Sequence, residues 1–265
     1  MTYIETDEKL DTSEFDELRM YFGDDYKVND FITIHQPTMQ EIIDFGEKQT
    51  YASIAPFTGN PTSYRLQLWD IGIDWNKISD FELFAMLTQS MKKESTSLIF
   101  GDFDFSILKP YTGQDEDGNK FIILADNIEF PRYVIDEKLY LHIREYIREM
   151  FDQHPKVEKA KGKMTKEMII DEERMKLNQE LKKKDGVNRS FLLPLISSMV
   201  NHPGFKYKKN ELREIKIVEF MDSVKRLQVY ESTRALMSGM YSGMIDTSKM
   251  NLNKELNWLR DLHEK

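Results

Sequence analysis

Residues 136–151 read DEKLYLHIREYIREMF and give the clearest structural signal in the chain. Asp136 suits an N-cap, because its carboxylate accepts hydrogen bonds from the free N–H groups of a first helical turn. Apolar side chains then recur every three or four residues, and charged side chains line the opposite face. The apolar face holds Leu139, Ile143, Ile147, Met150 and Phe151, and the charged face holds Arg144, Glu145, Arg148 and Glu149. The stretch predicts an amphipathic helix, and helical patterns dominate the chain that follows it.

Two capping boxes indicate helices upstream of this stretch. Thr38 precedes Glu41 by three residues, and Ser79 precedes Glu82 by the same spacing. In this pattern the hydroxyl and the carboxylate each accept a hydrogen bond from a backbone N–H group that the helix leaves free. Each box therefore predicts the start of a helix.

Between these helices the sequence predicts short strands. Residues 105–111 and 120–125 flank Asp117-Gly118, a typical hairpin turn, and residues 133–135 are a candidate third strand. Residues 97–100 are a further strand candidate, because they form a short apolar run. The predicted fold class is α+β, predominantly α-helical, with a small antiparallel β-hairpin unit near residues 97–135.

Composition and charge divide the chain into four expected parts. Residues 1–29 predict an acidic flexible arm, and residues 30–155 an α+β domain. Residues 156–187 are charged and poor in apolar side chains, and they predict a helical connector. Residues 188–265 predict a helical domain.

The acidic arm has two interpretations. Residues 1–30 hold ten acidic and three basic side chains, whereas residues 156–184 hold ten basic and six acidic ones. A charge-rich terminus of this kind usually remains solvated and disordered. The alternative is an arm that covers a basic or sticky surface until a partner arrives.

Several classes of protein do not fit the composition. The chain of 265 residues has no cysteine, which excludes disulfide scaffolds and zinc sites built on thiolates. Its apolar runs are far shorter than the roughly 20 residues that span a bilayer, and its acidic start does not resemble a signal peptide. The sequence contains neither of the common Gly-rich phosphate-binding motifs. We expect a cytoplasmic protein without a membrane partner.

The candidate catalytic and metal-binding residues are few. Asp102 and Asp104 alternate along the chain, so on a strand both carboxylates could face one Mg²⁺ ion. The other interpretation is an ordinary acidic turn, which is the more common use of such residues. Five histidines lack any metal-ligand spacing: His35, His142, His154, His202 and His263. We therefore predict no catalytic residue, no metal site and no cofactor.

Nucleic acid is also not an expected partner. Lys206, Lys208 and Lys209 alternate with Phe205 and Tyr207, and such a segment could contact phosphates and stack on bases. A chain with a net charge of −9 repels nucleic acid unless a basic face is well separated.

The most apolar helical stretch, residues 191–200, is a candidate protein-binding site. Its candidate contact residues are Phe191, Leu192, Leu195 and Met199. The alternative is that they belong to the core. The chain also has 15 methionines, whose flexible side chains suit surfaces that adapt to partners.

Several phrases of the sequence resemble those of a known group of proteins. They are Ile32 to Thr38 (ITIHQPT), Glu41 to Glu47 (EIIDFGE), Leu68 to Trp75 (LWDIGIDW), Asp80 to Phe84 (DFELF), Leu192 to Asn201 (LLPLISSMVN), Gly204 to Tyr207 (GFKY), Phe220 to Arg226 (FMDSVKR) and Tyr241 to Asp246 (YSGMID). Residues 30–265 resemble proteins encoded in the morphogenesis modules of phages that infect Gram-positive bacteria. The arm lies outside this resemblance.

The resemblance implies a tail assembly chaperone rather than an enzyme. Such a protein binds the tape-measure protein, tail-tube subunits or both, and acts in the host cell cytoplasm or as a minor virion component. Self-association also remains open. The rival hypotheses are a permanent virion component, such as a baseplate or connector subunit, and a metal-dependent nuclease that uses Asp102 and Asp104. A third is an inhibitor of a host protein whose acidic arm mimics nucleic acid.

Overall fold

The computed structural model describes residues 2–5, 15–114, 120–182, 189–245, 248 and 250–262. Most of these residues are helical, and the strands form small antiparallel sheets. The predicted α+β, predominantly helical fold class is confirmed. The helices are α1 (Glu17–Tyr21), α2 (Met39–Phe45), α3 (Glu47–Thr58), α4 (Arg65–Asp70), α5 (Asp80–Leu87), α6 (Lys93–Phe100), α7 (Glu137–Phe151), α8 (Lys163–Lys182), α9 (Leu192–Asn201), α10 (Ile217–Tyr241) and α11 (Leu252–Glu255).

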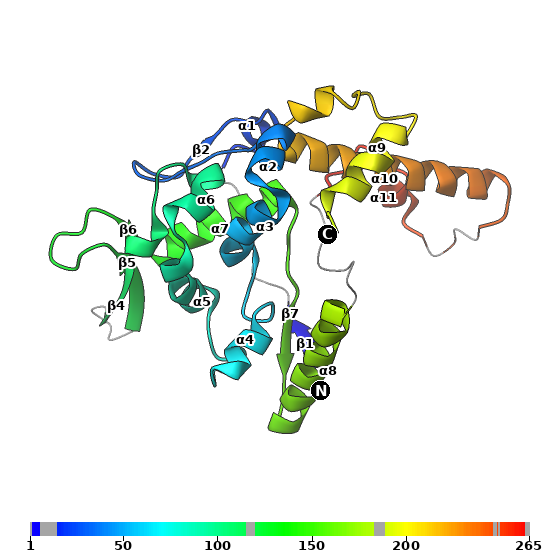
Figure 1. Ribbon diagram of the computed structural model, residues 1–265. Helices are drawn as coiled ribbons and strands as arrows, with labels where there is room; N and C mark the ends of the chain where they lie inside the picture. Colours follow the sequence, from blue (N-terminus) through cyan, green and yellow to red (C-terminus); the bar gives the residue numbers. More distant parts are fainter. Residues whose placement is uncertain are drawn as a thin grey trace.

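The strands make three sheets within the described ranges. β1 pairs with β7, β2 pairs with β3, and β5 lies between β4 and β6. In Figure 1 the β4–β5 hairpin lies at one edge of the molecule, far from the projecting helix α8. The bounds are β1 (Thr2–Glu5), β2 (Tyr26–Lys27), β3 (Thr33–Ile34), β4 (Lys109–Gln114), β5 (Lys120–Ala125), β6 (Val134–Ile135) and β7 (Val157–Ala160).

Helix α7 begins where the sequence predicts and organises the main core. The Asp136 carboxylate accepts a hydrogen bond from the backbone N–H of Leu139 at 2.8 Å. The helix ends before Pro155, because Asp152 adopts a left-handed conformation with φ of 52°. Helices α3 and α10 pack against α7, which lies near the middle of the molecule in Figure 1. The apolar face of α7 is buried, as its pattern predicts.

The charged face of α7 is also mostly buried, contrary to the simple amphipathic pattern. Arg144 is only 4% exposed, and its guanidinium lies 2.6 Å from the Asp80 carboxylate and 2.8 Å from that of Glu145. Arg148 donates to the carbonyl of Gly59 at 3.0 Å. These contacts let the charged face pack inward, because each buried charge meets an opposite charge or a carbonyl.

Aromatic side chains fill the main core beside α7. Phe84 of α5 stacks on Tyr140 with ring centroids 4.6 Å apart, and Phe57 of α3 lies 5.1 Å from Phe84. Phe105 completes the group at 5.5 Å from Phe57. Offset and edge-to-face packing of this kind adds to the stabilisation from burying the rings.

Both predicted capping boxes are confirmed. Thr38 and Glu41 cap α2, and Ser79 and Glu82 cap α5, with the hydroxyl and the carboxylate bonded reciprocally in each case. These bonds satisfy backbone N–H groups that a helix start would otherwise leave without a partner.

The hairpin is confirmed, but two of the strand predictions are wrong. Strands β4 and β5 pair from Lys109 opposite Ala125 to Gln114 opposite Lys120, and β6 pairs with β5. The predicted turn at Asp117-Gly118 lies outside the described residues. Residues 97–100 form the last turn of α6, and residues 105–107 form a 3₁₀ turn. Apolar runs of four residues do not distinguish a strand from a buried helical turn.

Residues on both sides of the expected connector share one apolar core. Leu192, Met199 and Phe220 belong to the same buried cluster as Ile143 and Phe151 of α7. The backbone also joins the two parts, because Ile217 N–H donates to the carbonyl of Pro37 at 3.0 Å. The boundary expected at residues 156–187 therefore does not separate two independent cores.

The segment expected to be a flexible acidic arm is partly folded. Phe15 is buried and contacts the rings of Tyr26 and Tyr146 edge to face. Asp16 caps α1 by accepting from the backbone N–H groups of the next turn. Strand β1 pairs with β7, and residues 6–14 lie outside the described residues. A few apolar side chains anchor residues 15–29 despite their acidic composition.

A smaller apolar cluster holds α8 to the rest of the molecule. Ile170 of α8 is buried against residues of α4, α5, β7 and the segment between α4 and α5: Leu66, Leu68, Trp75, Leu83 and Ala160. In the described part of the chain, no helix is both long and apolar enough to span a membrane.

Candidate interaction surfaces

The predicted contact residues of α9 divide between core and surface. Leu192 and Met199 are buried in the main core, and Leu195 is half-buried. Phe191 is 54% exposed and packs edge to face on Tyr51. Of the four predicted residues, the structure therefore leaves only Phe191 with more than half of its surface exposed to solvent.

Helix α9 is held against α3 by a polar contact at its start. The carboxylate of Glu47 accepts a hydrogen bond from the backbone N–H of Leu192 at 2.7 Å. The hydroxyl of Ser190 accepts from the N–H of Leu193 at 2.8 Å. Both bonds satisfy free N–H groups of the first turn, and they fix α9 with Leu192 facing inward.

Ion pairs dock one side of α8 on α4 and the segment that follows it. Lys166 contacts the Asp74 carboxylate at 2.5 Å, and Arg174 pairs with Asp70. Arg65 pairs with Glu173 of α8 and, at 2.8 Å, with Glu158 of β7. Together with buried Ile170, these contacts fix which face of α8 points outward.

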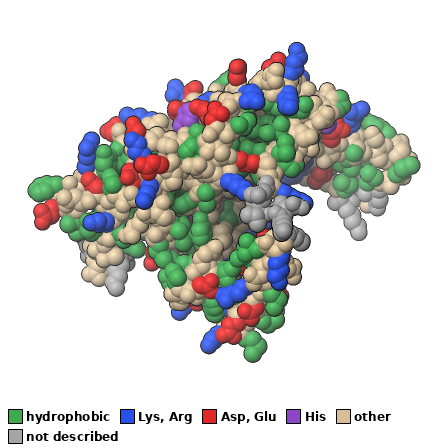
Figure 2. Space-filling view, viewed as in Figure 1, with side chains coloured by type: hydrophobic (Ala, Val, Ile, Leu, Met, Phe, Trp, Pro, Cys, Tyr) green, Lys and Arg blue, Asp and Glu red, His purple; other side chains and the backbone are tan. Residues whose placement is uncertain are grey.

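The outward face of α8 carries three exposed methionines. Met164, Met168 and Met175 are 76%, 60% and 63% exposed. Their spacings of four and seven residues place them on one side of a helix. We call these three residues the methionine face. Figure 2 shows apolar side chains lying among charged ones along the projecting arm that carries α8.

This face was not among the predicted sites, although its signal is present in the sequence. The prediction treated residues 156–187 as a polar connector because their average apolar content is low. Periodicity within residues 163–182, rather than average composition, would have identified the stripe. The high methionine content also indicated an adaptable binding surface, but it did not indicate which helix carries that surface.

A second exposed apolar site lies on the loop between β5 and β6. Ile128 and Phe130 project into solvent, and Phe130 is 84% exposed. The carboxylate of Asp126 accepts from the backbone N–H groups of Arg132 and Tyr133, each at 3.0 Å. The loop is thus an ordered turn that presents two apolar side chains.

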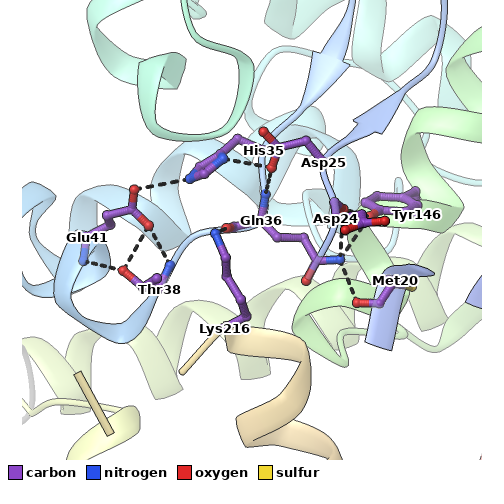
Figure 3. Close-up of polar contacts among 9 residues, drawn as sticks. All are labelled: Met20, Asp24, Asp25, His35, Gln36, Thr38, Glu41, Tyr146 and Lys216. Carbon is purple, nitrogen blue, oxygen red and sulfur yellow. Dashed lines mark hydrogen bonds and ion pairs between the residues drawn. The ribbon is translucent and has the colours of Figure 1, made fainter. Parts of the chain in front are cut away.

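A polar cluster around His35 ties three segments together (Figure 3). His35 Nδ1 lies 2.8 Å from the Asp25 carboxylate, and Nε2 lies 3.2 Å from that of Glu41. Buried Gln36 donates to the carbonyl of Met20 and to the hydroxyl of Tyr146, at 2.8 and 3.0 Å. These contacts join the segment before β2, the start of α2 and helix α7.

The same cluster anchors the start of α10. The ammonium group of Lys216 donates to the backbone carbonyl of Gln36 at 2.6 Å. Burial raises the pKa of Tyr146 to about 12, so its hydroxyl stays protonated at neutral pH. Burial opposes ionisation of Glu41, but hydrogen bonds from Thr38 and the nearby His35 lower its pKa overall.

The His35 cluster has the geometry of a structural clamp. Its two carboxylates lie at opposite ring nitrogens, so they do not converge on one point as metal ligands do. Among the described residues, no group of three or more histidine and carboxylate side chains is arranged to hold a metal ion.

The candidate metal pair Asp102 and Asp104 is engaged by separate partners. Asp102 pairs with Lys93 at 2.7 Å, whereas Asp104 accepts from the backbone N–H and hydroxyl of Ser106 at 2.9 and 2.6 Å. These contacts match the acidic-turn interpretation of the two residues. His154 lies near Glu149 and Asp152, and His263 lies outside the described residues.

The lysine segment predicted as a nucleic-acid candidate is exposed but lies beside acidic side chains. Phe205 and Tyr207 pack on each other, and the Tyr207 hydroxyl donates to the Glu219 carboxylate at 2.5 Å. Glu211 accepts from the backbone N–H of Lys208 at 2.8 Å. These carboxylates reduce the positive potential that Lys206, Lys208 and Lys209 would otherwise produce.

Comparison of this chain with protein-family models, curated proteins and solved structures finds no match.

Proposed function

We propose that this chain is a phage morphogenesis protein that acts as a tail assembly chaperone. In this proposal it binds the tape-measure protein, tail-tube subunits or both in the host cytoplasm. It uses no cofactor and carries no catalytic residue. The resemblance of residues 30–265 to phage morphogenesis proteins supports the class of process, and the exposed methionine face supports binding as the activity.

The methionine face is the observation that carries the proposal. Met164, Met168 and Met175 remain in solvent on a helix whose opposite side is fixed by ion pairs. Unbranched thioether side chains adapt to apolar surfaces of varied shape. An amphipathic helix from a partner, the type of segment expected of a tape-measure protein, could bury its apolar face here.

Co-expression tests this proposal directly. The tape-measure protein of the same phage should become soluble with the wild-type chain and co-elute with it in size-exclusion chromatography. The double variant Met168→Asp/Met175→Asp should lose the complex, because it places charges in the interface. The matched control Ile128→Asp/Phe130→Asp changes two apolar side chains that are similarly exposed, and it should retain the complex.

Two results would contradict the proposal. One is a tape-measure protein that stays equally insoluble with and without the wild-type chain. The other is equal loss of binding in both double variants, which would show that the methionine face has no special role.

Mass spectrometry of purified particles distinguishes the chaperone from the permanent virion component. A chaperone that leaves after assembly is absent from mature particles or present in trace amounts. A baseplate or connector subunit is present in fixed proportion to the other structural proteins. Presence in fixed proportion would support the principal rival hypothesis, a permanent virion component, in place of the chaperone. The methionine face would then remain the proposed binding surface.

A further inference from the structure

Along one edge of β7, which we call the inner edge, side chains rather than another strand form hydrogen bonds with the backbone N–H and C=O groups. The hydroxyl of Thr62 accepts from the N–H of Glu158 at 3.0 Å and donates to its carbonyl at 3.3 Å. The amide of Asn76 donates to the carbonyl of Ala160 at 2.7 Å and accepts from its N–H at 3.4 Å. The indole N–H of Trp75 also donates to the carbonyl of Glu158, at 3.2 Å. These side chains imitate a neighbouring strand.

The remaining backbone N–H and C=O groups of β7 point to its opposite edge, which we call the outer edge. Backbone groups of successive strand residues point to alternate edges, so Val157 and Lys159 present theirs to the opposite side. Strand β1 covers that side in antiparallel register, with Tyr3 opposite Lys159 and Glu5 opposite Val157. Figure 1 shows β1 lying beside β7 next to α8.

The two strands lie in segments of opposite charge. Residues 156–163 hold four lysines and one glutamate, whereas residues 2–8 hold three acidic side chains and no basic ones. An extended segment with acidic side chains is therefore attracted to this edge. A two-stranded sheet is also only marginally stable, so an occupant of four residues is easily replaced.

We propose that the outer edge of β7 is a peptide-binding site that takes an extended, acidic segment of a partner protein by strand addition. In the free chain Thr2–Glu5 occupies this site. Main-chain hydrogen bonds from Val157 and Lys159 supply the affinity, and the surrounding lysines select acidic segments. The proposal rests on β7 and not on the methionine face, so it stands or falls separately from the chaperone function.

A labelled peptide with the sequence of residues 2–8, TYIETDE, is the probe. Fluorescence anisotropy measures its binding to the full-length chain and to the full-length variant Tyr3→Pro/Glu5→Pro. These prolines remove the two N–H groups of β1 that face β7, so the variant opens the edge. We expect the opened variant to bind the peptide at least about tenfold more tightly than the wild type.

A disulfide lock provides a second test that does not rely on proline. The chain has no cysteine, so Glu5→Cys/Val157→Cys introduces the only thiols, at directly paired positions. Paired strand positions are close enough for a disulfide. The oxidised protein should bind the peptide about tenfold more weakly than the same protein after reduction.

Charge-reversal variants, made in the opened protein, test the specificity of the site. Lys159→Glu/Lys161→Glu should weaken peptide binding. The control Lys176→Glu/Lys182→Glu changes the net charge of the protein by the same amount, but its substitutions lie on α8, and it should not weaken binding. Failure of the opened variant to bind the peptide would overturn the proposal. So would equal binding by the wild-type and opened proteins, or failure of the cysteine pair to form an intrachain disulfide.

Discussion

Arg144 shows how a single buried charge supports the main core. Its guanidinium bridges Asp80 of α5 and Glu145 of α7, and all three side chains are largely shielded from water. Removing one partner leaves buried carboxylates without their closest cation. We predict that Arg144→Met lowers the free energy of unfolding by about 3–5 kcal/mol, measured by urea denaturation at pH 7.

The exposed ion pair between Lys93 and Asp102 provides the control for Arg144. Because solvent already screens this pair, Lys93→Met should leave the unfolding midpoint nearly unchanged. Equal losses of stability in the two variants would contradict the distinction between the buried and the exposed pair.

Glu41 gives a prediction about acid stability. Its pKa in the folded chain lies below the ordinary value of 4.5, so ionised Glu41 stabilises the fold above that pH. The contribution disappears as the pH falls through the lowered pKa, because the proton then binds folded and unfolded chains alike. The difference in unfolding free energy between wild type and Glu41→Gln should shrink steadily below pH of about 4.5.

Unfolding curves at a series of pH values measure this difference directly. A gap between wild type and Glu41→Gln that stays constant from neutral to strongly acidic solution would show that ionised Glu41 does not stabilise α2 through Thr38 and His35.

At the level of elements, helix starts were the most predictable features. The capping boxes at Thr38 and Ser79 and the cap at Asp136 are local patterns, complete within four residues. Helix α3 was not predicted, because Pro56 lies inside it and polar residues blur its periodicity. Tertiary packing, which local sequence does not specify, stabilises such a helix.

Helix α8 should open more easily than the rest of the molecule. One buried apolar side chain, Ile170, and a set of ion pairs hold it in place. We predict that Ile170→Ala makes the amides of α8 exchange with solvent at least about tenfold faster while those of α7 stay protected. Mass-spectrometric hydrogen exchange measures both helices in one experiment.

A uniform increase in exchange over α7 and α8 would contradict this prediction. It would mean that the smaller apolar cluster around Ile170 and the main core unfold as one unit. The exposed substitution Met168→Ala is the control, and it should change neither helix appreciably.

At the level of the whole molecule, the arrangement of charged and apolar faces was least predictable. The charged face of α7 is buried through contacts with Asp80 and Gly59. Both residues come from segments distant in sequence, so the local pattern of α7 does not predict this burial. For the same reason, the apolar character of Leu192 and Met199 did not reveal that these side chains complete the main core. Periodicity in the sequence places the three methionines on one side of α8, but only the ion pairs on the opposite side show that the methionines face solvent.

The account predicts that this chain acts by binding another protein through the methionine face. Hydrogen exchange of the chain, alone and mixed with the proposed partner, a phage tape-measure protein, tests this claim most directly. We predict slower exchange of the amides of α8 in the mixture, with no change in the loop that carries Ile128 and Phe130. Unchanged exchange of α8 in a mixture that forms a complex would contradict the claim.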